Sequence, residues 1–176
     1  MKRSLPAFRY HPDPIATGAI VESDETCLCC GEVGGFIYVL SFYAEKEIEA
    51  ICPWCIESGR AAATFDGMFS DDWPLRQAGL SDDIVEEVTR RTPGFESWQQ
   101  ERWLAHCSDA CAFLGDASKR DLQALSEGLG SMDDLQEWAR EDYLRLLEYY
   151  EPKCSPAVYK FQCLHCKELI YGIDQC

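Results

Sequence analysis

Two cysteine pairs in the first third of the chain have the spacing of a zinc site. Cys27 and Cys30 form a C-x-x-C motif that Gly31 follows, and Cys52 and Cys55 form a second such motif. A C-x-x-C turn directs two sulfur atoms to one point, and Zn²⁺ prefers four thiolates in a tetrahedron. We therefore expect these four cysteines to bind one structural zinc ion.

Other interpretations of these pairs remain open. The thiols could be reduced and metal-free in a core, or one pair could be a redox C-x-x-C. The redox interpretation expects a thioredoxin-like βαβ context, which the residues around Cys52 and Cys55 lack. Cys29 lies between two expected ligands, so we interpret it as a spectator that could compete with Cys27 or Cys30.

A second cysteine set suggests a second zinc ion. Cys107 and Cys111 are four residues apart, a spacing that brings two side chains to one face of a helix, and Cys163 and Cys166 form another C-x-x-C motif. The 51 residues between the two pairs mean that only the tertiary fold can close this site. A neighbouring imidazole, from His106 or His165, is an alternative ligand to one of the sulfur atoms.

Enzymatic chemistry has little support in the residue patterns. A four-cysteine site leaves no coordination position open for hydrolysis, and the motifs of serine hydrolases, H-E-x-x-H metalloproteases and phosphate-binding loops are missing. His11 and Asp13 could form an acid–base pair, but a histidine in a proline-rich arm is more often a packing residue. Cys154 and Cys176 have no partner at motif spacing.

The charge balance restricts the kinds of partner. The chain has 16 basic and 31 acidic residues, a formal net charge of −15. Such a chain is not expected to bind nucleic acids or anionic membranes, because binding to either depends on basic residues. A basic protein is the natural electrostatic complement. A zinc-dependent regulator that contacts nucleic acid through Arg90 and Arg91 is a less favoured alternative.

The acidic residues are concentrated in the middle of the chain. Residues 71–151 carry a net charge of −11 and include four acidic pairs. These pairs are either a solvated face or a docking surface. The longest apolar run is too short for a membrane span, and the first residues do not resemble a secretory signal. We therefore expect a cytoplasmic protein, in which thiols stay reduced and available to metals.

These observations predict a single α+β domain over residues 1–176. Residues 1–70 are expected to form an extended arm and the first cysteine-rich module, with a strand over 36–43, a hairpin partner over 47–52, and a short helix or turn over 61–65. An acidic helical segment over 71–151 is expected to contain helices that begin at Ser81, Ser97 and Ser131 and a short one over 122–125. Residues 152–176 are expected to form a hairpin whose turn is a zinc knuckle.

Four longer stretches resemble the CbrC family of bacterial proteins. They read LPAFRYHPDP, CPWCIESGRAAATFD, RRTPGFESWQQERWLAHCSDACAFLG and FQCLHC. The family is related to a protein linked to tolerance of a DNase colicin. The resemblance implies a zinc-containing α+β protein, and it suggests a nuclease-type toxin as the basic partner. Lys167 departs from the pattern, because zinc knuckles often have glycine there.

Overall fold

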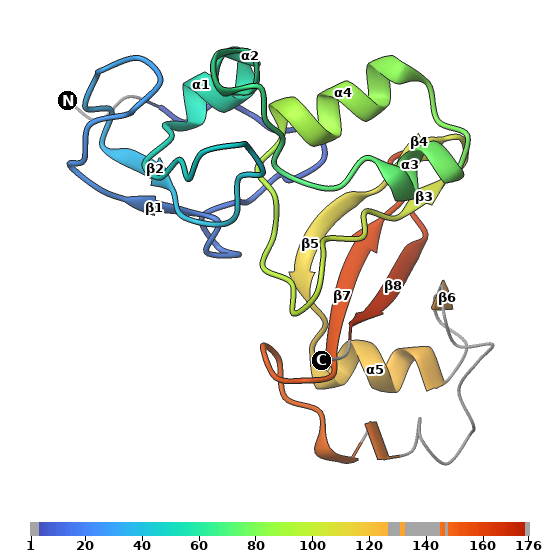
Figure 1. The fold of residues 1–176 in the computed structure, drawn as a ribbon. Coiled ribbons are helices and arrows are strands. Elements are labelled where there is room, and N and C mark those ends of the chain that lie inside the picture. The colour runs from blue at the N-terminus through green and yellow to red at the C-terminus, as the bar shows by residue number, and fades with distance from the viewer. Residues whose placement is uncertain (1–3, 127–130, 133–144, 147, 175–176) are drawn as a thin grey trace.

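The chain folds into a mixture of short helices and small sheets (Figure 1). The computed structural model describes residues 4–126, 131–132, 145–146 and 148–174. An α+β architecture was expected and is confirmed. The described strands are β1 (Ile20–Glu22), β2 (Phe36–Tyr38), β3 (Ala105–His106), β4 (Asp109–Ala110), β5 (Ala112–Asp116), β6 (Ser131–Met132), β7 (Ala157–Gln162) and β8 (Leu169–Asp174), and the helices are α1 (Pro53–Glu57), α2 (Arg60–Phe65), α3 (Trp73–Gln77), α4 (Asp82–Arg91) and α5 (Lys119–Ser126).

The N-terminal module is built on a two-stranded sheet. Strand β1 pairs antiparallel with β2, so the expected strand exists but ends at Tyr38 and takes its partner from the arm. Of the expected hairpin partner over 47–52, only Ile51 forms a bridge, to Tyr38. Ala50 has a φ of 51°, and this left-handed conformation interrupts the extended backbone that a longer strand would need.

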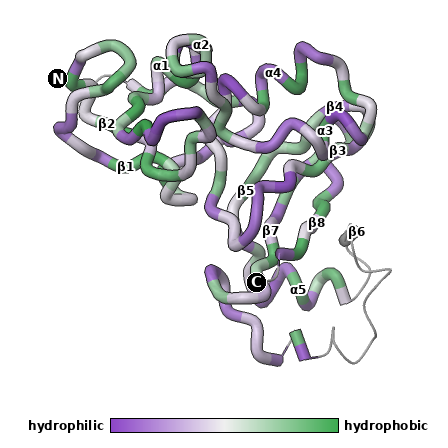
Figure 2. Tube along the Cα trace, viewed as in Figure 1, coloured by the Kyte–Doolittle hydropathy of each residue, from purple (hydrophilic) through white to green (hydrophobic). Residues whose placement is uncertain are grey.

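Helix α4 lies against α1 and α2 of the N-terminal module and against β4, and it begins where the sequence predicts. Asp82 and Asp83 occupy its first turn and Arg90 and Arg91 its last, which suits the helix dipole. Its buried residues include Val85 and Val88. Figure 2 shows hydrophilic and hydrophobic residues alternating along α4, as expected for a helix with one buried face.

A four-stranded sheet forms the second half of the molecule, in the order β5-β7-β8-β6. Strands β7 and β8 are the expected C-terminal hairpin, with Gln162 opposite Leu169 next to the turn. One face of this sheet packs on an aromatic core. That core includes Phe95, Trp103, Phe113 and Phe161.

The prediction of a helix that begins at Ser97 is wrong. Residues 97–104 are not helical, and Trp103 is buried in the aromatic core, where its indole N–H donates to the Cys111 carbonyl at 2.8 Å. The Leu104 carbonyl accepts the Cys111 N–H at 2.9 Å. This segment therefore uses its backbone groups in sheet-like pairing, which the local capping pattern could not reveal.

The helix expected from Ser131 also starts differently. Ser131 and Met132 form β6, which runs parallel to β8. Residues 133–144 and 147 of that expected helix lie outside the described residues, and helical conformation is found at 145–146 and 148–149. The short helix over 122–125 is confirmed as part of α5, and the one over 61–65 as part of α2.

The N-terminal arm links the two halves of the molecule. Phe8 is buried in the core of the N-terminal module, whereas Tyr10 is buried in the aromatic core that packs on the four-stranded sheet. Within the described part of the chain, none of the helices has the length and apolar character that crossing a membrane requires.

Candidate metal centres

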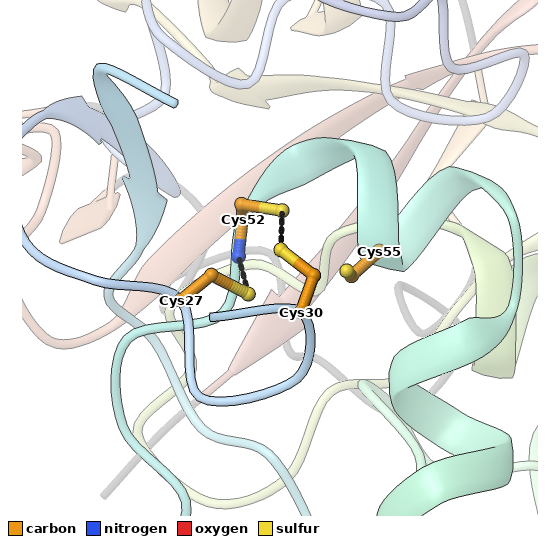
Figure 3. Close-up of side chains that lie close together, drawn as sticks. All are labelled: Cys27, Cys30, Cys52 and Cys55. Atoms are coloured by element: carbon orange, nitrogen blue, oxygen red, sulfur yellow. Dashed lines mark hydrogen bonds between the residues drawn. The ribbon is translucent and has the colours of Figure 1, made fainter. Parts of the chain in front are cut away.

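The first cysteine group converges as the sequence predicts. The sulfur atoms of these four residues all lie within 4.8 Å of one another: Cys27, Cys30, Cys52 and Cys55. Figure 3 shows the four side chains pointing toward a common centre. Cys27, Cys52 and Cys55 are buried and Cys30 is half-buried. We call this group site 1; it could hold a metal ion.

Two local structures position the thiols of site 1. In the first, the Cys27 carbonyl accepts the Gly31 N–H at 2.8 Å, and the Cys27 N–H donates to the Glu32 carbonyl at 2.9 Å. Gly31 has a φ of 75°, which glycine adopts without strain. In the second, Cys52 immediately precedes α1 and Cys55 lies in its first turn. The turn and the helix start therefore each present two sulfur atoms.

The thiols of site 1 differ in how readily they ionise. Burial raises the pKa of Cys27, but N–H groups of Cys52, Cys30 and Cys29 outweigh it and lower the pKa to about 7. Burial and the neighbouring Cys27 thiol raise the pKa of Cys52 to about 12, and burial likewise raises the pKa of Cys55. Four thiolates cannot coexist here without a positive charge, and a bound divalent cation would supply it.

A second group, site 2, forms where the four-stranded sheet meets the β3–β4 hairpin. Donor atoms of His106, Cys107, Cys163 and Cys166 lie within 4.8 Å of one another. The Nδ1 atom of His106 lies 3.3 Å from the Cys107 sulfur and 3.4 Å from the Cys166 sulfur. Cys107 and Cys166 are exposed, whereas Cys163 is buried. Site 2 could also hold a metal ion, closer to solvent than site 1.

Two turns present the three sulfur donors of site 2, and His106 is the last residue of β3. Cys107 and Ser108 form the two-residue turn between β3 and β4, with φ values of 52° and 57°. Cys163 and Cys166 lie in the turn between β7 and β8, where the Cys163 N–H donates to the Glu168 carbonyl at 2.9 Å. In the same turn the Lys167 N–H donates to the Cys163 carbonyl at 3.2 Å.

Electrostatics at site 2 repeat the pattern of site 1. Burial raises the pKa of Cys163, but the Cys166 N–H, contact with His106 and the His165 N–H lower it overall, to about 6. Desolvation and the thiols of Cys163 and Cys166 raise the pKa of Cys107 to about 11. One thiolate is thus favoured in each group.

The structure does not bring Cys111 into site 2, although the sequence predicted it as the fourth ligand. The expected helical turn at 107–111 is a β-hairpin, on which a spacing of four residues does not place two side chains together. Cys111 is buried in the aromatic core beside site 2 but is not one of the four converging donors. Burial, followed by the charges of nearby groups that include Cys163 and Cys166, raises its pKa to about 12. His106, which the sequence left as an alternative, supplies the fourth donor.

His165, the other alternative, points elsewhere. Its Nε2 atom lies 2.9 Å from a carboxylate oxygen of Asp109. The buried Asp109 also accepts the Tyr10 hydroxyl at 2.8 Å and the Arg9 guanidinium at 2.6 Å. This network fastens the arm to the hairpin of site 2, a contact that no sequence motif indicated.

His11 has the geometry of a packing residue. Its Nδ1 donates to the Pro93 carbonyl at 2.9 Å, and its Nε2 accepts from the Thr17 hydroxyl at 2.7 Å. Burial lowers the His11 pKa to about 4, so the ring is neutral at pH 7. The Asp13 carboxylate instead caps a turn by accepting the Ala16 N–H at 3.1 Å. No acid–base pair is therefore formed.

The remaining candidates lie outside the metal groups. Cys29 contacts the Thr64 hydroxyl at 3.7 Å, and Cys154 is exposed. Cys176 lies outside the described residues. Arg91, one of the two arginines considered for nucleic-acid contact, donates to the Glu57 carbonyl at 2.8 Å.

Comparison with known proteins places the chain in a family. The model of the "Uncharacterised protein family (UPF0167)" matches residues 5–175. The chain belongs to the UPF0167 family. A UPF0167 protein of Pseudomonas aeruginosa is 48% identical over 99% of both chains. UPF0167 proteins of Mycobacterium bovis and Mycobacterium tuberculosis are each 39% identical over 93% of this chain and 90% of theirs.

None of these names carries the CbrC label. No solved structure matches the chain.

Proposed function

We propose that this UPF0167 protein binds two zinc ions, one at each site. The observation that carries this proposal is the convergence of two separate sets of four sulfur and nitrogen donors. Zn²⁺ favours such sets, whereas Mg²⁺ and Ca²⁺ favour oxygen ligands. Thiolate-rich tetrads also suit Fe–S clusters, but a cluster needs more room than one ion, and these donors surround a single point.

The zinc ions act as structural braces in this proposal. Four protein donors fill a tetrahedron, so neither ion has a position for substrate or water. Site 1 joins the Cys27 turn to the start of α1, and site 2 joins the β3–β4 hairpin to the end of the β7–β8 hairpin. Each ion thus connects segments that are distant in sequence.

Elemental analysis of the purified protein tests this proposal. We expect two zinc ions per chain. The His106→Ala variant should retain one ion, whereas Cys111→Ala should retain two because Cys111 lies in the core rather than in site 2. A full metal content in His106→Ala, with one ion lost in Cys111→Ala, would contradict the assignment of the fourth donor.

We further propose that the protein is a non-enzymatic interaction protein of the cytoplasm that binds a basic partner. The net charge of −15 supports this, and on α4 the carboxylates of Asp83 and Glu86 are exposed. Some acidic side chains are already neutralised, since Arg76 pairs with Asp72 and Asp82. The resemblance to the CbrC family makes a nuclease-type toxin the first partner to test, and a reducing compartment would keep the thiols able to bind zinc.

Calorimetric titration with a basic nuclease domain tests the partner. Binding should be measurable at low salt and weaker at moderate salt, because salt screens exposed charges. A mutant nuclease with its basic face neutralised is the matched control. No heat of binding at either salt concentration would exclude this class of partner while leaving the zinc assignment intact.

A further inference from the structure

A cleft of about 640 Å³ separates residues 39–49 of the N-terminal module from the segment that follows α4. Figure 1 shows that this segment passes between the module and β5 on its way to β3. Two of its lining residues are hydrogen-bonded to each other, because the Tyr43 hydroxyl donates to a carboxylate oxygen of Glu101 at 2.5 Å. Neither metal site lines this cleft.

The ionisable side chains that line the cleft include four glutamates, which carry negative charge when ionised. Glu47, Glu49 and Glu96 are exposed at its rim, whereas Glu101 is only 4% exposed. None of the described lining residues is basic. The Tyr43 hydroxyl already donates to Glu101, and burial raises the pKa of that carboxyl. The three exposed rim carboxylates therefore supply the negative charge that would attract a cation into the cleft.

The cleft also has an apolar part, formed by Leu40, Phe42 and Ile48, beside the polar residues Ser41, Ser97 and Gln99. Phe42 packs against Phe69 with ring centroids 4.7 Å apart, which holds the Phe42 ring in place. Phe95 is buried in the aromatic core and leaves this wall to the three partly buried side chains. Aromatic faces attract cations, and they also cover aliphatic chains. The cleft therefore offers an apolar wall and a negative rim to the same ligand.

A bare metal ion does not suit this lining. Among the described residues, the carboxylates of the cleft do not converge as the donors of sites 1 and 2 do. A divalent cation needs several oxygen atoms around one point. Carboxylates spread along an apolar wall instead suit an elongated cation.

We infer that the cleft binds a basic side chain, arginine or lysine, that a partner protein presents, with its aliphatic stem against Leu40, Phe42 and Ile48 and its cation among the exposed glutamates. This inference rests on the proposed binding of a basic protein, and it names the place of contact. The net charge of −15 supports a protein partner, because it attracts a basic surface before the side chain enters the cleft.

Capped tripeptides test the cleft directly. The probes are acetyl-Gly-Arg-Gly-amide and acetyl-Gly-Lys-Gly-amide, titrated into the zinc-loaded, ¹⁵N-labelled protein. Matched controls replace the basic residue by citrulline or norleucine, which keep the stem and lose the charge. We expect amide resonances of residues 39–49 and 95–101 to shift with the basic peptides only. No shift up to ~10 mM peptide, a concentration that reveals even millimolar affinity, would overturn the inference.

Charge-matched variants separate the cleft from general acidity. Glu49→Gln with Glu96→Gln removes two exposed charges at the rim, and Asp83→Asn with Glu86→Gln removes two from α4. We expect about tenfold weaker peptide binding for the first pair, equal to ~1.4 kcal/mol, and little change for the second. Equal weakening by both pairs would overturn the inference, because only the net charge would then matter. If putrescine shifted the amide resonances of the cleft but neither basic peptide did, the inference would also be overturned.

The same samples distinguish failure of the cleft from failure of the proposed function. Zinc content and titration with the basic nuclease domain are measured on each of them. Two zinc ions and nuclease binding without peptide binding would refute the cleft alone. Peptide binding to the cleft without nuclease binding would retain the cleft and refute that partner.

Discussion

The two metal sites share one local motif and differ in what completes it. Each begins with the pattern C-L-x-C-x-E, at Cys27 and at Cys163. In each, the first cysteine donates its N–H to the glutamate carbonyl at 2.9 Å and accepts an N–H from the residue before that glutamate. The other half of site 1 is the start of α1, whereas the other half of site 2 is the exposed β3–β4 turn.

This difference determines how each site meets solvent. The completing cysteines of site 1, Cys52 and Cys55, are buried within the N-terminal module, but at site 2 the completing Cys107 is exposed, and so is Cys166 of the shared motif. The module around site 1 has a short two-stranded sheet, and three of the site 1 cysteines lie within its hydrophobic core, so we expect loss of the metal to disturb that core. Site 2 instead lies at the end of a sheet with its own aromatic core. We therefore expect the N-terminal module to depend more on its metal ion than the four-stranded sheet does, although both sites contain the same motif.

Removing one ligand from each site should show the largest difference. We expect Cys52→Ser to unfold the N-terminal module, because the loss of zinc removes on the order of 10 kcal/mol, comparable to the whole stability of a domain. Cys166→Ser should lose its ion but keep the four-stranded sheet. Hydrogen exchange and zinc content together measure this, with Cys29→Ser as a control that retains both ions. Equal loss of protection in both ligand variants would break the comparison.

Glu168 should matter for metal binding at site 2, whereas Glu32 should not at site 1. The Glu168 carboxylate lies 3.7 Å from Nε2 of His106, where it favours the tautomer that turns the Nδ1 lone pair toward the thiols. Loss of such a partner lowers metal affinity about 10–100-fold. We therefore expect this loss for Glu168→Gln in a competition titration with a zinc chelator.

Glu32→Gln is the matched control, because Glu32 occupies the same position in a site without histidine. If the two substitutions weaken zinc binding equally, Glu168 does not act through His106.

Acid should weaken the arm that connects the two regions. The His11 pKa of about 4 lies below the value of 6.5 for an unfolded chain. The unfolded chain therefore binds more protons, and the stability contributed by neutral His11 is complete above pH 6.5 and is lost as the pH falls toward 4. We expect this group to cost about 2 kcal/mol between pH 7 and pH 5.

Urea unfolding with zinc in excess, compared between the parent chain and His11→Gln, isolates this contribution. Metal release affects both proteins alike, so identical pH dependence in the two would contradict the assignment of a neutral, buried His11.

Exchanging the fifth residue of the two motifs should give the smallest effect. Gly31 and Lys167 have φ values of 75° and 66°, a region that costs a side-chain-bearing residue about 1 kcal/mol. No atom lies within 4 Å of a Cβ added at Gly31, so only the backbone conformation opposes a substitution there. We expect Gly31→Lys to destabilise the protein by about 1 kcal/mol in thermal unfolding.

Lys167→Gly should have the opposite sign and a smaller size. The glycine relieves the backbone, but it increases the freedom of the unfolded chain and loses the contact from the Lys167 ammonium to the Leu164 carbonyl at 2.6 Å. Destabilisation by both substitutions would show that the Lys167 contact outweighs the backbone strain.

The cysteine pairs, α4 and the C-terminal hairpin were predictable because their signals are local. A C-x-x-C turn brings its own two sulfur atoms together, and the residues from Ser81 to Pro93 contain both ends of α4. The gathering of Cys27, Cys30, Cys52 and Cys55 was also predicted, since about 20 residues allow only a short return path.

Only the tertiary structure determined which donor completes site 2 and which strands pair. The spacing of Cys107 and Cys111 fits a helix, but this segment forms a β-hairpin, after which Cys111 is buried in the aromatic core while His106 lies beside the thiols. Strand β1 likewise replaces residues 47–52 as the partner of β2. The sequence thus determined the half-sites that short turns can build alone, whereas contacts between distant segments determined how those halves are joined, because their energy comes from packing that no local pattern encodes.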